Sequence, residues 1–339
     1  MEKLFKQNVG IDVSKDTFDA VFVKLTNKQE IKVIAHKKFA NSLKGFEHLL
    51  NWSNKKKEDD MPISYTMEAT GIYYESLAYH LHGQGQSVYV VLPNKAKKYA
   101  ESLENKSKTD KLDAKSLGQL GAERKLRKWE VMSKSFQKLK QLTREREGII
   151  QERTNIKNQL HAMNNSANKS TTSIKRAQVR IMFLDTQVKE IEKELRHVLA
   201  EDRELSEKIS KLQTIPGVAL ITSAIIIAET NGFASIENIK QLTSYSGLDI
   251  IEKQSGKWRG KSKISKKGNS HIRKALYFPA FTLIKNDKNM NKLYLRLKEK
   301  KKLSMIAAVA VQRKLLGLMY VLWKNNTSYD PEYKQKIIA

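Results

Sequence analysis

In the first third of the chain, apolar residues recur with the short period of β-strands before the longer period of helices takes over. β-rich runs at 9–13, 18–25 and 31–39 are spaced as in a meander of antiparallel strands. A helix, a strand ending at Glu68, a second helix, a short buried strand at 87–92 and a third helix are predicted to follow. This βββ-α-β-α-β-α order is the succession expected of a ribonuclease-H-like α/β fold.

After about residue 133 the apolar residues recur at alternating steps of three and four, as at the a and d positions of heptads. The pattern covers 139–163 and, after a polar break, 174–212, where only Asp202 is out of place. A heptad pattern of this length is a strong signal for a coiled coil. We predict a coiled-coil region over 131–212, either an antiparallel hairpin or an arm that pairs with another subunit.

The last part of the chain, residues 213–330, is predicted to form a mostly helical domain. It begins with a Pro-Gly turn at 214–218 and an apolar helix at 219–229, which resemble one half of a helix-hairpin-helix element. In such elements the amides of the turn can meet a DNA phosphate. A basic stretch at 253–285 follows and ends in a predicted helix over 271–284.

Charge restricts the partners that this chain can have. The 339 residues carry a formal net charge of +27, far beyond what solubility needs. A long polyanion is the natural partner, because neutralising its phosphates releases counterions. An anionic membrane surface is the weaker alternative, since the basic residues do not form one amphipathic helix.

What the chain lacks excludes several classes of protein. It has no cysteine, which excludes disulfides, thiolate zinc sites and cysteine catalysis. The N-terminus has no apolar signal-peptide core, and the apolar run at 221–228 is too short to span a bilayer. We therefore expect a soluble cytoplasmic protein.

Carboxylates at separate places in the chain are candidates for a metal site. Asp12 lies within an apolar strand, where a charge is disfavoured unless it has a partner. Glu68 ends a later strand, and Asp110 and Asp113 share one face of a predicted helix. A ribonuclease-H-like sheet would gather all of them at one edge, where their oxygens suit Mg²⁺ or Mn²⁺ and a phosphate substrate. The alternative is that they are ordinary surface acids.

A second candidate site lies in the basic stretch, in the loop 254–261. Ser255 stands beside a glycine there and could attack a phosphate, with Lys and Arg stabilising the transition state. The alternative is a loop serine in a phosphate-binding patch. Other serines are chemically comparable, namely Ser244, Ser246, Ser262 and Ser265. The residues predicted to contact nucleic acid, with a tryptophan that stacks on a base or ribose, are Lys108, Lys111, Lys257, Trp258, Arg259, Lys261, Lys263, Lys266, Lys267 and Arg273.

Five stretches, taken together, carry a resemblance to a known family. They are GIDVSKDTFDA, MEATGIYYESLAYHL, NKSKTDKLDAKSLGQL, IPGVALITSAIIIAE and SGKWRGKSKISKKGNSHIRKAL. In this order they resemble the DEDD transposases of the IS110 insertion-sequence family, to which the pilin-gene inversion recombinases also belong. The resemblance implies a RuvC-like domain over residues 1–130 and a C-terminal transposase domain. The family's metal-binding residues fall on Asp12, Glu68, Asp110 and Asp113, and its nucleophilic serine on Ser255.

The resemblance also implies a mechanism. Members of the family are similar in cutting DNA through a covalent phosphoserine, at a composite site with carboxylates from one subunit and serine from another. They assemble as dimers and tetramers, and a structured bridge RNA pairs with both donor and target DNA. This chain departs from the family in one place, where Gly256-Lys257 stands in a position that is often Gly-Gly.

We therefore expect an RNA-guided DNA recombinase of a bacterial or archaeal insertion sequence. Its cofactor would be Mg²⁺ or Mn²⁺, and its partners would be donor and target DNA, a guide RNA and further copies of the chain. The first alternative, a RuvC-type junction nuclease, needs the carboxylates but no serine, so Ser255→Ala would leave it cutting. The second, a non-catalytic basic coiled-coil scaffold for nucleic acid, needs neither, so Asp12→Asn would be silent.

Overall fold

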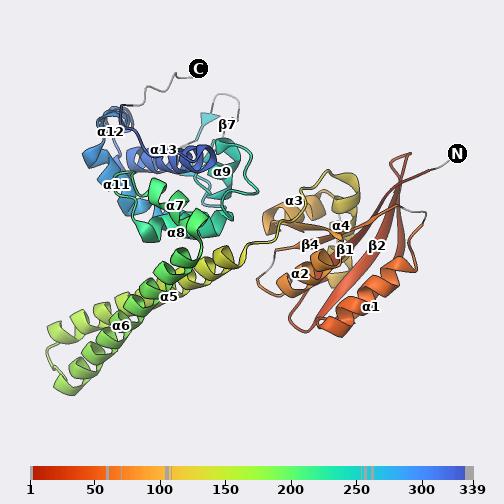
Figure 1. The fold of residues 1–339 in the computed structure, drawn as a ribbon, viewed down its shortest axis with the longest axis horizontal. Coiled ribbons are helices and arrows are strands. Elements are labelled where there is room, and N and C mark those ends of the chain that lie inside the picture. The colour runs from red at the N-terminus through yellow and green to blue at the C-terminus, as the bar shows by residue number, and fades with distance from the viewer. Residues whose placement is uncertain are drawn as a thin grey trace. The chain divides into compact units, whose positions relative to one another are not determined.

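The computed structural model describes residues 3–58, 61–69, 71–103, 107, 109–252, 254–255, 258–260 and 263–332. The chain divides into two compact units, Met1–Val131 and Met132–Ala339 (Figure 1). As predicted, the architecture is mixed α/β, with a sheet in the N-terminal unit and a largely helical C-terminal unit. The further boundary predicted between residues 212 and 213 stays a prediction.

The first unit is built on a mixed sheet with the strand order β3-β2-β1-β4-β5. β1, β2 and β3 are antiparallel neighbours, whereas β4 runs parallel to β1 and β5 parallel to β4. This is the arrangement that the predicted ribonuclease-H-like succession requires. The strands are β1 (Leu4–Val13), β2 (Thr17–Thr26), β3 (Ile31–Ala40), β4 (Ile63–Glu68) and β5 (Ser87–Val91). The helices are α1 (Leu43–Asn54), α2 (Glu75–Gly83), α3 (Pro93–Ser102) and α4 (Asp110–Glu123).

Alternation along the strands gives this sheet two different faces. Val9 and Ile11 of β1 point to one face and join a buried cluster with residues of α1 and α2. Gly10 points to the other face, where an added Cβ would lie only 2.0 Å from the Gly118 nitrogen of α4. The two backbones are so close that only glycine fits at this position. The contact holds the first turn of α4 beside the end of β1.

Two long helices begin the second unit and lie side by side in Figure 1. They are α5 (Lys134–Asn165) and α6 (Thr171–Glu201). Arg146 of α5 pairs with Glu192 of α6 at 2.7 Å, and Arg153 pairs with Asp185, so the helices run antiparallel. The helical hairpin is therefore present, and its coiled-coil character stays a prediction.

Asp202, which was out of place in the heptads, ends α6 and caps α7 (Arg203–Leu212). Its side chain accepts a hydrogen bond from the Leu205 nitrogen at 3.1 Å, as an N-cap aspartate does. The remaining helices of the unit are α8 (Leu220–Thr230), α9 (Ile239–Tyr245), α10 (Ser270–Ala275), α11 (Tyr277–Asn286), α12 (Lys288–Lys301) and α13 (Ser304–Asn325).

One buried cluster joins the base of the hairpin to these helices. Leu139 of α5 and Leu195 of α6 share it with Ile227 of α8 and Leu315 of α13. α13 is long and apolar enough to cross a membrane by length and composition alone, but half of its most apolar window is buried inside the protein. Its role in this unit is that of a core helix.

The basic stretch differs from its prediction in two respects. The helix predicted over 271–284 is interrupted at Leu276, between α10 and α11. Pro279 explains the break, because it has no N–H to donate to the carbonyl of Ala275. Short strands that were not predicted also lie here: β6 (Ile250–Ile251), β7 (Gln254–Ser255), β8 (Trp258–Arg259) and β9 (Lys263–Ile264). They form two small antiparallel pairs, β6 with β9 and β7 with β8.

Candidate active site

The acids predicted to form a metal site come together at one end of the sheet. Asp12 lies near the end of β1, and the register of β4 pairs Ile11 with Met67, so that Glu68 is the next residue along the neighbouring strand. On the same face, α4 places Asp110 and Asp113 in its first turn. Thr109 caps this turn by accepting a hydrogen bond from the Leu112 nitrogen at 3.3 Å.

The electrostatics of Asp12 show that the acids converge. Burial and the nearby negative charges raise the pKa of the Asp12 carboxyl to about 6. After burial, the contributions in order of size come from Asp113, Asp110, Glu68 and Asp19. Each of the predicted carboxylates is therefore close enough to act on Asp12. Asp19, opposite Asp12 on β2, was not among the predicted residues.

These acids have the chemistry for a divalent cation but do not form a closed cage. Carboxylate oxygens are the donors that Mg²⁺ and Mn²⁺ prefer, and besides burial the charges of the neighbouring acids contribute to the raised pKa of Asp12. Among the described residues, however, no three His, Asp or Glu side chains converge tightly enough to hold a metal ion as they stand. A bound cation would offset the repulsion between these carboxylates.

Ser255 lies in the second unit, at the corner of a tight hairpin. Ser255 of β7 pairs with Trp258 of β8, and its side chain is exposed. Gly256 and Lys257 lie outside the described residues. The exposed side chain of Ser255 is accessible to a DNA strand that approaches the basic segment.

Burial separates the serines that were chemically comparable. Ser246 is buried and donates to the Thr243 carbonyl at 2.8 Å. Ser265 donates to the Asp249 carboxylate at 2.5 Å, which ties β9 to the segment before β6. Ser262 lies outside the described residues, and Ser244 is exposed on α9. Exposure is therefore compatible with an attacking role for Ser255 and Ser244, and unfavourable for Ser246.

The predicted nucleic-acid contacts are only partly visible. Lys111 is exposed on α4, and Lys263, Lys266 and Lys267 are exposed around β9. Arg273 is half-buried, and its guanidinium donates to the carbonyls of Ser246 and Gly268 at 2.8 and 3.0 Å, so it supports the fold of the basic segment. Outside the described residues lie Lys108, Lys257 and Lys261, together with the side chains of Trp258 and Arg259.

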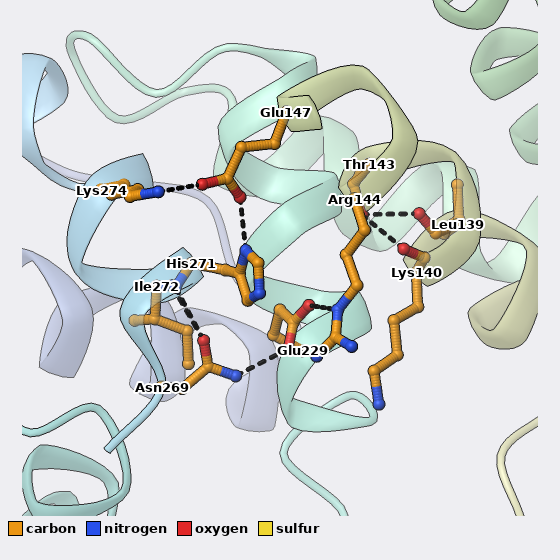
Figure 2. A network of polar contacts seen from close by, with 10 residues as sticks. All are labelled: Leu139, Lys140, Thr143, Arg144, Glu147, Glu229, Asn269, His271, Ile272 and Lys274. Atoms are coloured by element: carbon orange, nitrogen blue, oxygen red, sulfur yellow. Dashed lines mark hydrogen bonds and ion pairs between the residues drawn. The ribbon is translucent and has the colours of Figure 1, made fainter. Parts of the chain in front are cut away.

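An ion pair with a buried carboxylate, which has no local signal in the sequence, anchors the end of the basic segment. Figure 2 shows Glu229 of α8 between Arg144 of α5 and Asn269, the N-cap of α10. Arg144 donates to both carboxylate oxygens, at 2.7 and 3.0 Å, and Asn269 donates at 2.6 Å. Burial alone would raise the pKa of Glu229, but these hydrogen bonds outweigh it and the pKa is lowered.

A second cluster in Figure 2 ties the same helices together one turn along α5. Glu147 of α5 bonds His271 of α10 and also pairs with Lys274 at 2.5 Å. The two clusters fix α10, and with it the end of the basic segment, against α5. The segment that carries Ser255 is thus held at its C-terminal end by the base of the hairpin.

Glu229→Ala is expected to destabilise the second unit by about 1–3 kcal/mol, because the buried carboxylate is the shared acceptor of Arg144 and Asn269, while the half-exposed Arg144 can turn to water. Urea denaturation followed by circular dichroism measures the loss. Glu190→Ala, which removes an exposed acid of α6, should change the free energy of unfolding by less than about 0.5 kcal/mol. A loss below about 1 kcal/mol for Glu229→Ala would mean that the network contributes little.

A carboxylate site on a mixed sheet, with an exposed serine in a basic segment, is compatible with an enzyme that cuts and joins DNA, and known proteins similar to this chain are of that class. A family model described as a transposase, of the DEDD group of IS110, matches residues 9–166. A second, described as the transposase IS116/IS110/IS902 family, matches residues 209–295. The two models match separate parts of the chain and both carry IS110 transposases in their descriptions.

Relatives of this chain include the pilin gene-inverting protein of Moraxella bovis, 28% identical over 331 residues that cover 96% of this chain and 98% of the relative. The transposase of insertion sequence element IS1328 from Yersinia enterocolitica is 25% identical and covers 59% of this chain and 65% of its own. Among solved structures, T. thermophilus RuvC in complex with a Holliday junction substrate aligns with 35% of this chain and 93% of its own, at 10% identity and a TM-score of 0.27.

These similarities point to one class of enzyme, the DNA transposases and recombinases. The acids around Asp12 are oxygen donors of the kind that a divalent metal takes.

Proposed function

We propose that this chain is a recombinase of an insertion sequence that cuts and rejoins DNA through a phosphoserine intermediate, with Mg²⁺ as its metal and a bridge RNA as its guide. The observation that carries the proposal is the convergence on Asp12 of acids from β4 and α4. Burial is the largest cause of the raised pKa of Asp12, and the charges of the neighbouring acids add to it, a combination that is common at functional sites. The exposed Ser255 in a basic hairpin supplies the second component.

The chemistry divides between the two units. Asp12, Glu68, Asp110 and Asp113 would hold the cation, which when bound polarises the scissile phosphate. The Ser255 oxygen attacks phosphorus, the bond to one deoxyribose oxygen breaks, and that oxygen takes the proton that the serine gives up. The serine–phosphorus bond keeps the energy of the phosphodiester, so a second deoxyribose hydroxyl can displace the serine without water.

The basic segment positions the DNA in this scheme. Lys263, Lys266 and Lys267 are exposed near the hairpin and would neutralise the phosphates beside the scissile bond. Lys108, Lys111, Lys257, Arg259, Lys261 and Arg273 are proposed to add backbone contacts, and Trp258 a stacking contact. The net charge of +27 supports a partner as large as a DNA–RNA assembly.

The helical hairpin is proposed to hold subunits together. The carboxylates and Ser255 belong to different compact units of the chain, which is compatible with a composite site built from two copies in a dimer or tetramer. The gene-inverting activity named for the Moraxella bovis relative is consistent with rejoining as well as cutting. We place the reaction in the cytoplasm, on chromosomal DNA.

The test is strand exchange in a purified system. The protein is mixed with DNA that carries the element's ends, with target DNA, and with RNA transcribed from the sequence beside the reading frame. Recombinant junctions, detected by PCR and sequencing, should form with Mg²⁺ or Mn²⁺ and disappear when EDTA is added or the RNA is left out. Cutting of a four-way junction without RNA would favour a junction nuclease instead, and exchange in EDTA would contradict the metal site.

A further inference from the structure

We propose that Asp19 is a positioning residue of the metal site, an outer carboxylate held by His36 and Lys38 that sets the affinity of the Asp12 site for its cation. This rests on the metal site put forward above.

The register of the sheet puts Asp19 directly beside Asp12. The two residues are paired across the antiparallel strands β1 and β2. Side chains of directly opposed residues lie on the same face, with their Cβ atoms roughly 4.5–5.5 Å apart. Val21 and Val23, two and four positions along β2, pack with Ala114 of α4, so Asp19 faces the side of the sheet that α4 covers. A row of acids thus crosses the sheet from β4 through β1 to β2.

The third strand braces Asp19 from the outside. His36 of β3 lies with its Nε2 atom 2.6 Å from one carboxylate oxygen, and the Lys38 Nζ atom lies 3.6 Å from the other. Asp19 is only 6% exposed, so without such partners its burial would be costly. Both oxygens are engaged by β3, which leaves Asp19 suited to act beside the metal rather than as one of its main ligands.

Two consequences follow for the cation. A fixed carboxylate next to Asp12 deepens the negative potential that attracts a divalent ion. The contacts of Asp19 with His36 and Lys38 of β3 also restrict the position of the Asp19 carboxylate, which lies opposite Asp12. Outer partners of metal ligands commonly change metal affinity by about 10–100-fold when they are removed.

The experiment measures metal binding without DNA, as the binding of Mn²⁺ to the full-length protein by calorimetry and by metal-dependent shifts in melting temperature. Asp19→Asn, which keeps the size of the side chain, should raise the Kd for Mn²⁺ by about 10–100-fold. Asp16→Asn is the matched control, because it removes an exposed acid three residues away and should leave the Kd within about twofold of wild type. Each titration is compared with the same variant free of metal, which separates binding from fold stability.

His36 provides an independent arm. His36→Ala should weaken Mn²⁺ binding by about 10-fold, and His36→Gln, which restores a donor, should recover most of the loss. If Asp19→Asn does not fold, this pair of variants decides the question. Wild-type affinity in Asp19→Asn, or in His36→Ala, overturns the role of Asp19. Wild-type affinity in Asp12→Asn would instead show that the proposed metal site itself is wrong.

Discussion

Asp12→Asn is expected to lower DNA cleavage by about 1000-fold or more while making the metal-free protein more stable at neutral pH. The loss of cleavage follows because Asp12 is the acid on which the others converge. A metal that polarises a phosphoryl oxygen is worth several kcal/mol of transition-state stabilisation, and each 1.36 kcal/mol corresponds to tenfold in rate.

The gain in stability follows from the same electrostatics. The pKa of Asp12 is raised from 3.8 to about 6 in the folded protein, so the folded state holds this proton more tightly than the unfolded state. Stability is then lost as the pH rises from about 4 to 6. A tenfold change in proton affinity is worth about 1.4 kcal/mol, so above pH 6 the ionised carboxyl costs about 2 kcal/mol once partial solvent screening is allowed for. The neutral amide of asparagine removes this cost.

Thermal and urea unfolding in EDTA, between pH 4 and pH 8, measure this effect. The variant should exceed the wild type by about 2 kcal/mol at pH 7 and match it near pH 4. Addition of Mg²⁺ should raise the melting temperature of the wild type and leave that of the variant unchanged. Asp16→Asn should follow the wild type throughout. A variant that is less stable than wild type at pH 7 would contradict the convergence of the acids.

The sequence allowed most of this acidic site to be predicted, because each member has a local signal. Asp12 is a charge within an apolar strand, and Asp110 and Asp113 have the spacing of one helix face. Asp19 has no comparable signal, because it stands at the polar start of its strand. Its partners His36 and Lys38 lie on β3, and their contacts depend on a register with a bulge between Phe22 and Val23.

Long-range pairing also explains why the Glu229 network in the second unit was not predicted. Glu229 is a lone acid at the end of an apolar helix, and nothing near it in sequence shows that Arg144, 85 positions earlier, will pair with it. The heptads indicated long helices because a stripe of apolar residues is a local pattern, but the run at 174–212 is divided at Asp202 between α6 and α7. The two-residue strands around Ser255 are too short to produce a period, so the hairpin emerged only from the structure.

Ser255→Ala is expected to abolish the covalent protein–DNA adduct and to reduce strand exchange by at least about 1000-fold, because no other group replaces the serine oxygen in the transferred bond. Labelled element-end DNA is incubated with protein, RNA and Mg²⁺, and the adduct is detected on a denaturing gel as a band that protease removes. The exposed hydroxyl contributes little to the fold, so the melting temperature should stay unchanged. Ser244→Ala, an exposed serine of α9, should form the adduct normally.

The same variant can show which subunit supplies the serine. Neither Asp12→Asn nor Ser255→Ala cuts DNA alone, but a mixed dimer has an intact carboxylate set on one chain and an intact serine on the other. If each active site combines carboxylates from one chain with serine from the other, every mixed dimer has one complete active site. Mixing the two proteins should then restore part of the cleavage and of the adduct. If each chain cuts with its own serine, both sites of the mixed dimer are defective and the mixture stays inactive. Normal cleavage by Ser255→Ala alone would reject the serine mechanism and leave a nuclease that depends on the acids around Asp12.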